Sequence, residues 1–259
     1  MLVAQISDTH LIAPGSPGKF CDEKLTALEK CIECINELDT LPDVVIHTGD
    51  LSDNGSSEEL LLAKKYLDKL TVPYYVTPGN KDCADKLIEV FREQLSGVVI
   101  GEPITYLVDN LPIKLASLDT TTSLDNRGLL DFKKIAAIDK ILSMHQDDPV
   151  IIFSHHPPFN LSSENSPHFE FVSKNSIKLF GELVDRHSQI VALFCGHFHR
   201  PIRKSMGLFD ANIAPPVCNL IDYSSTKTGP NHIGNFQLHK FGKGHEFTTE
   251  VKMISHWIK

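Results

Sequence analysis

The sequence predicts an α/β protein in which short buried strands alternate with helices. Five apolar runs rich in β-branched residues recur along the chain, and segments with apolar residues at helical spacing lie between most of them. Each run stops abruptly at polar side chains, as expected where strands present residues at one edge of a sheet. With 259 residues and 41% hydrophobic content, the chain can bury a large core. We therefore expect a single domain over residues 1–259.

The expected strands and helices follow from two periodicities. Ser56 and Glu59 have capping-box spacing at the start of one helix, and Leu25, Leu28 and Ile32 repeat at helical spacing in another. The apolar strand runs are Leu2–Ser7, Val44–Asp50, Pro73–Thr77, Pro149–Ser154 and Ile190–Cys195. The helical segments are Asp22–Leu38, Ser56–Leu70, Lys86–Leu95, Asp131–Leu142 and Asn175–His187.

The remaining segments indicate loops and antiparallel strands. Segments 13–19, 51–55, 120–128 and 161–168 are irregular and are expected to be loops. Residues Ile104–Val108 and Ile113–Asp119 predict a hairpin. The short alternating segments Gly234–Lys240 and Phe247–Ile254 predict an antiparallel tail that adds strands to a second sheet.

Composition excludes several classes of protein. The formal net charge of −8, with no block of Lys or Arg, argues against nucleic-acid binding, which needs a basic face. The six cysteines have no framework spacing, and Cys31 and Cys34 lie in a helical pattern without a second such pair, so we expect reduced thiols. No apolar run approaches the roughly 18 residues of a membrane helix, and we expect a cytoplasmic protein that does not interact with membranes.

The first apolar strand ends in Asp8-Thr9-His10. Residues two apart in an extended segment point the same way, so Asp8 and His10 can converge on one point in front of the sheet. A carboxylate with an imidazole suits a divalent transition metal. Taken alone, the pair fits equally well a turn cap followed by a surface histidine.

Four further strand ends carry similar polar groups. Asp50 follows Gly49, and Asn80 follows Gly79, although Asn80 by itself is more typical of a turn. The fourth run ends in His155-His156 before two prolines, so one imidazole faces a site and its neighbour points elsewhere. The fifth ends in Gly196-His197-Phe198-His199. Five strands with such ends are improbable by chance.

Together these motifs resemble those of the calcineurin-like metallophosphoesterase family, whose marks are Asp-x-His, Gly-Asp, Gly-Asn-His, one or two histidines, and Gly-His-x-His. The resemblance runs from Asp8 to His199 by motif. It implies a four-layer α/β/β/α sandwich of two mixed sheets flanked by helices.

The family's roles, transferred to matching positions, imply two metal ions, with Fe, Mn, Zn and Co all compatible with the mixed O/N donors. The implied ligands of the first ion are Asp8, His10, Asp50 and His199, and those of the second are Asp50, Asn80, His155 and His197. Two such ions about 3.5 to 4 Å apart can bridge a water, lower its pKa and clamp a phosphate for in-line attack on phosphorus.

Lys81 departs from the family pattern, because most members have a histidine after the Gly-Asn pair. A lysine can neutralise developing negative charge, but it is a poor acid near pH 7 unless its pKa is lowered. We expect Lys81 to keep the electrostatic role and to weaken acid catalysis, with a solvent-facing side chain as the alternative.

Within the family, the chain looks most like class III cyclic-nucleotide phosphodiesterases and their glycerophosphodiesterase relatives. The expected substrate is a small phosphodiester, first of all a 3′,5′-cyclic nucleotide, contacted by Asn80, Lys81 and His197. His156 either lines the substrate pocket or hydrogen-bonds the ligands. Dimers are common in such proteins, and the sequence identifies no interface.

Other polar residues have simpler expected roles. His47 is expected to be a core histidine or to support the ligands. Arg127, Arg200 and Arg203 are candidates for a phosphate clamp, but solvated positions explain them better. The remaining histidines considered are expected on the surface or in loops, and they are His168, His187, His232, His239, His245 and His256.

Two other functional classes remain open. A non-catalytic scaffold of the same fold typically loses metal ligands, whereas all seven positions here carry usable side chains. An enzyme of other specificity, such as a nucleotide or sugar-nucleotide pyrophosphatase or a monoesterase, would keep the same metal ligands. The ratio of diester to monoester hydrolysis separates that class from a phosphodiesterase.

Overall fold

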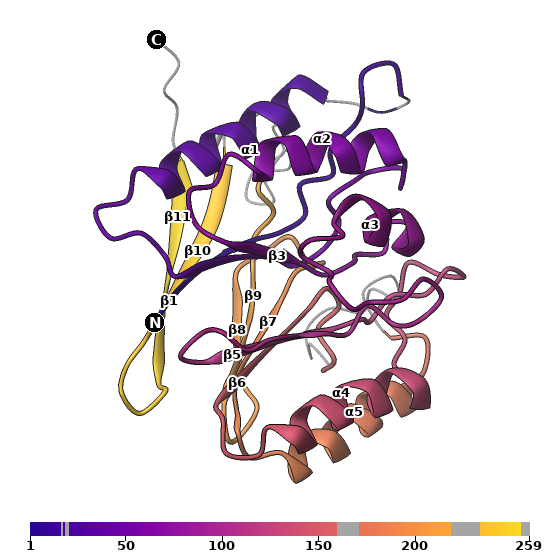
Figure 1. Ribbon diagram of the computed structural model, residues 1–259, viewed down its shortest axis with the longest axis vertical. Helices are drawn as coiled ribbons and strands as arrows, with labels where there is room; N and C mark the ends of the chain where they lie inside the picture. Colours follow the sequence, from indigo (N-terminus) through magenta and orange to yellow (C-terminus); the bar gives the residue numbers. More distant parts are fainter. Residues whose placement is uncertain (17, 19–20, 160–170, 219–233, 255–259) are drawn as a thin grey trace, which may run out of the picture.

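The computed structural model describes residues 1–16, 18, 21–159, 171–218 and 234–254. Two β-sheets lie face to face between two layers of helices (Figure 1). This is the four-layer α/β/β/α arrangement that the family resemblance implies. The expected loop at 161–168 and the histidines His168, His232 and His256 lie outside the described residues.

The first sheet has five strands in the order β11-β10-β1-β2-β3. These are β1 (Leu2–Ile6), β2 (Val44–His47), β3 (Tyr74–Val76), β10 (Gly234–Phe241) and β11 (Phe247–Ile254). β1, β2 and β3 are parallel, with Val3 opposite Val44 and Ile6 opposite His47. β10 pairs antiparallel with both β1 and β11.

The second sheet has six strands in the order β4-β5-β6-β7-β9-β8. These are β4 (Leu107–Val108), β5 (Lys114–Leu118), β6 (Val150–Ser154), β7 (Ile190–Cys195), β8 (Ile202–Ser205) and β9 (Asp210–Ile213). The four central strands are parallel, and β4 and β8 are antiparallel edges. The expected hairpin is therefore confirmed as β4 and β5.

Helices cover the outer face of each sheet. In Figure 1, α1 (Cys21–Asn36), α2 (Ser57–Leu67) and α3 (Ala84–Val90) lie on the side of the first sheet. The helices α4 (Phe132–Met144) and α5 (Lys174–Arg186) cover the second sheet. The capping box predicted for α2 is present, because Ser56 Oγ accepts the Glu59 N–H and the Glu59 carboxylate accepts from Ser56.

Two hydrophobic cores result from the alternation of side chains along the strands. In β6, Ile151 and Phe153 pack between the two sheets, whereas Val150 and Ile152 face the core under α4 and α5. All four residues are fully buried. Strands covered on both faces explain why their sequences read as continuous apolar runs.

Two expectations about the C-terminal tail are wrong. β10 and β11 join the sheet of β1 rather than a second sheet, because β10 pairs along β1 from Leu2 to Gln5. His239 on β10 is fully buried, since its ring stacks on Phe194 of the opposite sheet at 3.9 Å between centroids.

His187 is also buried and contacts Asp139. His245 is half-buried in the turn between β10 and β11.

Other expectations concern cysteines and membranes. All six cysteines are free, as the spacing predicts. Within the described part of the chain, none of the helices has the length and apolar character needed to cross a bilayer.

Candidate metal centre

The polar strand ends of both sheets meet at one place. The loops after β1 and β2 are joined by hydrogen bonds from Asp8 N to Gly49 O (3.0 Å) and from His10 N to Asp50 O (2.9 Å). The second sheet is joined to the first by the His197 N–H, which donates to Asp8 Oδ2 at 3.1 Å. Because parallel strands end at a common edge, these contacts gather side chains from five strands.

One set of donors, the first ligand group, consists of Asp8, His10, Asp50 and His199. Asp8 Oδ1 lies 3.2 Å from His199 Nε2, and the Nε2 atoms of His10 and His199 are 3.2 Å apart. His10 Nε2 is 3.9 Å from Asp8 Oδ1. Three of its side chains, those of Asp8, His10 and His199, offer donor atoms close enough together to hold one ion.

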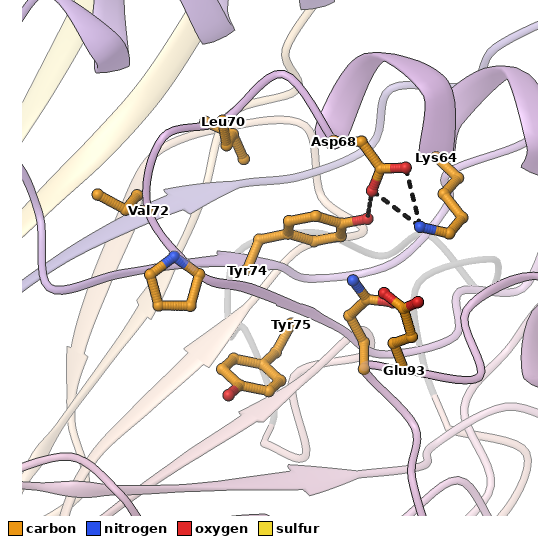
Figure 2. A pocket seen from close by; sticks show the side chains of 9 residues that line it. Lys64, Asp68, Leu70, Val72, Tyr74, Tyr75 and Glu93 are labelled. Carbon is orange, nitrogen blue, oxygen red and sulfur yellow. Dashed lines mark hydrogen bonds and ion pairs between the residues drawn. The ribbon is translucent and has the colours of Figure 1, made fainter.

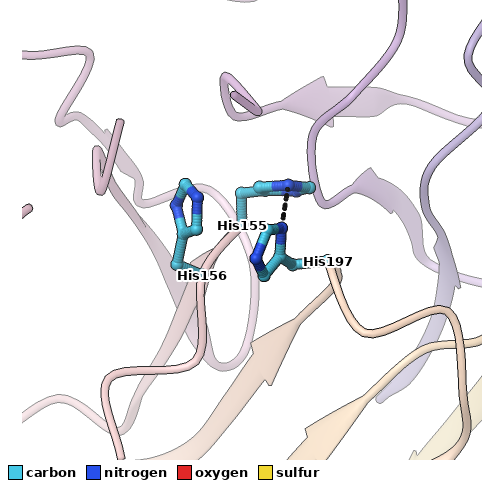
Figure 3. Close-up of side chains that lie close together, drawn as sticks. All are labelled: His155, His156 and His197. Carbon is cyan, nitrogen blue, oxygen red and sulfur yellow. Dashed lines mark hydrogen bonds between the residues drawn. The ribbon is translucent and has the colours of Figure 1, made fainter. Parts of the chain in front are cut away.

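The other set, the second ligand group, consists of Asp50, Asn80, His155 and His197. His155 Nε2 lies 3.0 Å from Asn80 Oδ1 and 3.2 Å from His197 Nδ1. Figure 3 shows the facing nitrogens of His155 and His197. Asp50, His155 and His197 are buried, whereas Asn80 is half-buried.

Asp50 belongs to both groups through a single oxygen. Its Oδ2 lies 3.6 Å from His10 Nε2 and 3.5 Å from His155 Nε2. Its other oxygen, Oδ1, accepts the backbone N–H of Lys81 at 2.7 Å. One carboxylate oxygen is thus held by the protein, and the other faces the space between the two groups.

A hydrogen bond orients one of the imidazoles, and close contact with a carboxylate orients a second. His155 Nδ1 donates to the Thr48 carbonyl at 2.8 Å, which fixes the ring so that Nε2 faces the second ligand group and is the atom that would bind a metal ion once it has lost its proton. His10 Nδ1 lies 3.3 Å from Asp53 Oδ1, so its Nε2 also faces the first ligand group. Asp53 is in turn 3.3 Å from Lys24 Nζ on α1.

The backbone at the centre is strained. Six non-glycine residues in the described part of the chain have a positive φ, and five of them are proposed ligands. These five are Asp8, His10, Asp50, His197 and His199, with φ between 45° and 72°. Left-handed backbone is costly for such residues and clusters at functional sites. Asp8 and His10 therefore converge through left-handed turns and not through the extended segment expected from the sequence.

Two glycines permit close approach of the loops. A Cβ on Gly79 would overlap Asp50 N and Oδ1, and a Cβ on Gly196 would overlap Ser7 Oγ and lie 2.7 Å from Asp8 Oδ2. Any larger residue at either position would displace a carboxylate of the centre.

The electrostatic field of the centre favours positive charge. Burial lowers the pKa of His155, but the adjacent Asp50 and Asp8 carboxylates outweigh it and raise that pKa to about 9. Burial raises the pKa of Asp8 and Asp50, yet the neighbouring histidines hold both pKa values below the usual range. Two ionised carboxylates among four imidazoles give a mixed set of oxygen and nitrogen donors that fits transition-metal ions.

His156 does not face the ligand groups with a free nitrogen. Its Nε2 donates to the Asn126 carbonyl at 3.0 Å, and its Nδ1 lies 3.0 Å from Thr120 Oγ1. Its ring packs against His197, with centroids 4.4 Å apart. Both nitrogens of His156 are thus hydrogen-bonded within the protein. This arrangement supports a role in holding the ligand His197 in place and argues against contact with substrate.

His47 and Asp82 connect the loops of the first sheet. His47 is buried, and its ring nitrogens contact Gly49 N and Thr9 Oγ1. Asp82 accepts N–H groups of Leu51 and Gly79, which joins the loops after β2 and β3. Sequence reasoning missed Asp82. Its only sequence signal is its place two residues after Asn80.

Two of the three arginines proposed as clamps are paired with carboxylates. Arg127 contacts Asp125, and Arg203 on β8 contacts Asp210 at 2.6 Å. Lys81 is half-buried, and its backbone contributes the contact to Asp50 described above.

Two cavities differ in their relation to this centre. One of about 250 Å³ is bordered by Asn80 and by Thr121, Thr122 and Ser123 of the loop after β5. The other, of about 460 Å³, lies at the amino end of β3. Figure 2 shows that its Asp68 carboxylate sits between the Tyr74 hydroxyl and Lys64, so these groups satisfy one another.

Comparison with known proteins agrees with this geometry. Residues 1–201 match the family model described as calcineurin-like phosphoesterase. A probable glycerophosphodiester phosphodiesterase from Arcobacter nitrofigilis is 35% identical over 205 residues, which are 77% of this chain and 72% of the relative. A 3′,5′-cyclic-nucleotide phosphodiesterase from Nostoc sp. is 28% identical over 256 residues, which are 97% of this chain and 92% of the relative.

Among solved structures, a dimetal phosphatase from Danio rerio superposes on this chain with a TM-score of 0.72 and 13% sequence identity. The match covers 98% of this chain and 96% of the phosphatase chain. That likeness shows the fold alone. The family model, which spans more than half of the sequence, and the Arcobacter relative show that this chain belongs to the calcineurin-like phosphoesterase family.

Proposed function

We propose that this chain, a metal-dependent phosphodiesterase, hydrolyses a small-molecule phosphodiester with two transition-metal ions, one in each ligand group. The observation that carries the proposal is the position of Asp50 Oδ2, 3.6 Å from His10 Nε2 and 3.5 Å from His155 Nε2. A carboxylate oxygen shared in this way is suited to bridge two cations. The proposed ligands are Asp8, His10, Asp50, Asn80, His155, His197 and His199.

When bound, the two ions would supply a water nucleophile at neutral pH and neutralise charge on the phosphoryl oxygens. The chain's own residues position the substrate. Asn80 presents an amide beside the cavity of about 250 Å³, and Lys81 adds a positive charge next to it in the sequence. Hydrolysis breaks the bond from phosphorus to the departing alcohol oxygen, which must gain a proton. Lys81 would stabilise the charge on that oxygen more effectively than it would protonate it.

Two diester classes are candidates. A 3′,5′-cyclic nucleotide is the class that the sequence predicts, and the Nostoc relative is named for that activity. The Arcobacter relative, with higher identity, is named as a probable glycerophosphodiester phosphodiesterase. Among the described residues that line the cavity beside Asn80, none is aromatic, so it offers no stacking surface for a base. The absence of a stacking surface favours the second candidate, a glycerophosphodiester, over a cyclic nucleotide.

The test is a panel of substrates after metal reconstitution. Stripped protein should regain activity with Mn, Fe, Zn or Co, and it should prefer bis(p-nitrophenyl) phosphate over p-nitrophenyl phosphate. Cyclic nucleotides and glycerophosphodiesters assayed in parallel identify the natural class. A clear preference for the monoester would overturn the diester assignment. Failure of purified protein to retain or rebind two ions would leave the scaffold alternative.

A further inference from the structure

A chain of buried hydrogen bonds runs from the tail strands to the first ligand group. Thr249 Oγ1 on β11 lies 2.9 Å from His239 Nδ1 on β10, and His239 Nε2 lies 3.0 Å from Gln5 Oε1 on β1. Gln5 Nε2 lies 3.0 Å from Thr48 Oγ1. Gln5, Thr48 and His239 are fully buried, so water does not compete for the bonds among them, whereas Thr249 is half-buried.

The last two links reach a proposed metal ligand. Thr48 Oγ1 lies 2.7 Å from Ser7 Oγ, and Ser7 Oγ lies 2.5 Å from Asp8 Oδ2. Five bonds therefore connect β11 with the carboxylate of Asp8. We name the set Thr249, His239, Gln5, Thr48 and Ser7 the Asp8 relay.

The direction of the Asp8 relay is fixed at Gln5. Its amide nitrogen also lies 2.8 Å from the Cys195 carbonyl, a group that can only accept a hydrogen bond. The amide oxygen must therefore face His239 and accept from its Nε2–H. His239 Nδ1 is consequently unprotonated and accepts the hydroxyl proton of Thr249.

The two hydroxyls continue in the same direction. Thr48 Oγ1 accepts from Gln5 and donates its one proton to Ser7 at 2.7 Å, with the Ile6 carbonyl a distant alternative at 3.4 Å. Ser7 then donates to Asp8 at 2.5 Å in preference to the Thr48 carbonyl at 3.4 Å. Every donor in the Asp8 relay thus points toward the carboxylate, and hydrogen bonds aligned in this way strengthen one another.

The end of the Asp8 relay determines which carboxylate oxygen is available. Asp8 Oδ2 receives the Ser7 hydroxyl and the shorter branch of the His197 N–H, at 3.1 Å, whereas Oδ1 is 3.3 Å from the same N–H and 3.2 Å from His199 Nε2. A carboxylate whose Oδ2 is held by two donors presents Oδ1 in one orientation to an ion in the first ligand group.

We propose that the Asp8 relay positions Asp8 for metal binding, and that its upstream members are therefore positioning residues for the first ligand group. This inference rests on the proposed function, because it assumes an ion held by Asp8, His10, Asp50 and His199. It also assigns a role to His239 and Thr249, which lie outside the residues 1–201 matched by the family model.

The test measures binding of Co²⁺ to stripped protein by visible absorption, which gives one dissociation constant for each ion. The variant Gln5→Met removes the amide donor at similar volume. Gln237→Met is the matched control, because Gln237 is a buried glutamine paired with Gln5 across β1 and β10, and its amide donates to the Ile213 carbonyl instead. The variant His199→Ala identifies the binding step that belongs to the first ligand group.

We expect Gln5→Met to weaken the first-group step about 10-fold, as typical for partners of a ligand, and to leave the other step unchanged. Gln237→Met should leave both steps unchanged. Thr48→Val should reproduce the effect of Gln5→Met, and Thr48→Ser, which keeps the hydroxyl, should restore wild-type binding. If Gln5→Met does not fold, the comparison of Thr48→Val with Thr48→Ser decides the question, because both substitutions keep the backbone of residue 48 and its contacts.

The proposal is overturned if Gln5→Met and Thr48→Val bind both ions like wild type, or if Gln237→Met shows the same loss as Gln5→Met. Equal weakening of both steps would also overturn it, since that result indicates a general structural effect. These outcomes differ from failure of the proposed function, in which the wild-type protein itself would not take up two ions.

The tail end of the Asp8 relay has its own test. His239→Phe keeps a ring against Phe194 and removes both hydrogen bonds. We expect a smaller loss of about threefold in the same binding step, since Cys195 still anchors the Gln5 amide. Binding of the first ion unchanged from wild type would limit the Asp8 relay to Gln5, Thr48 and Ser7 and overturn the role of the tail.

Discussion

The two ligand groups differ in charge and in burial. The first has its own carboxylate, Asp8, in addition to the shared Asp50, whereas the second adds only the neutral amide of Asn80 to Asp50. The first is more exposed, since the His10 and His199 side chains are 14% and 33% accessible, while His155 is fully buried. Because an added unit charge about 4 Å from an ion outweighs a modest gain in burial, the first group should bind its ion more tightly.

The largest expected effect comes from removing what the two groups share. Asp50→Asn keeps the size of the side chain and removes its charge, so both ions should bind weakly. A bound metal ion contributes several kcal/mol to transition-state stabilisation, and hydrolysis of bis(p-nitrophenyl) phosphate should fall about 10³-fold or more. The exposed Asp109→Asn provides the control. If Asp50→Asn still binds both ions, Asp50 does not bridge them.

The difference in charge can be tested by exchanging the residues that create it. Asp8→Asn should weaken the first ion by at least about 100-fold, because it leaves that group with Asp50 as its only carboxylate. Asn80→Asp should tighten the second ion and lower turnover, since a carboxylate beside the substrate repels the phosphate. Dissociation constants measured for both ions check each variant. If Asn80→Asp does not tighten the second ion, charge does not explain the difference between the groups.

A smaller effect is expected from the support of His10. Asp53 lies 3.3 Å from His10 Nδ1 and from Lys24 Nζ. Asp53→Asn should weaken the first ion about 10-fold and leave the second unchanged. The matched control is Asp68→Asn, because Asp68 also pairs with a lysine but contacts no histidine of the centre. Similar losses in both variants would assign the effect to general destabilisation.

The same comparison shows how far the sequence alone can predict the site. Asp50, Asn80 and His155 could be identified because each follows a short apolar run, and parallel strands bring such ends together. Left-handed backbone at Asp8 and His10 could not be predicted, because aspartate and histidine adopt it more often than most residues but still at a small minority of positions, and here only the contacts between loops impose it.

Contacts between distant segments explain what the sequence did not predict. β10 alternates like a half-exposed strand, but it pairs with β1 more than 230 residues away in sequence and lies between two other strands. His239 therefore lies between the sheets and belongs to the Asp8 relay, although its local sequence is typical of a surface strand. Asp82 was missed for the same reason, because its partners Leu51 and Ser52 lie in another loop.

The smallest expected effect concerns Lys81, next to the more weakly charged group. A lysine there adds positive charge near Asn80, which opposes binding of the second ion. Lys81→His should tighten the second ion a few-fold and raise turnover most for diesters with poor leaving groups, since an imidazole can protonate the departing oxygen. Its backbone N–H to Asp50 is unchanged by the substitution.

The measurement for Lys81 compares turnover across aryl diesters of increasing leaving-group pKa, with Lys86→His on α3 as the control. A dependence on leaving-group pKa that becomes shallower only in Lys81→His would show that acid catalysis has been gained. An unchanged dependence would mean that the Lys81 side chain faces solvent. In that case the second ligand group would owe its weaker binding to Asn80 alone, and Asn80→Asp would become the decisive variant.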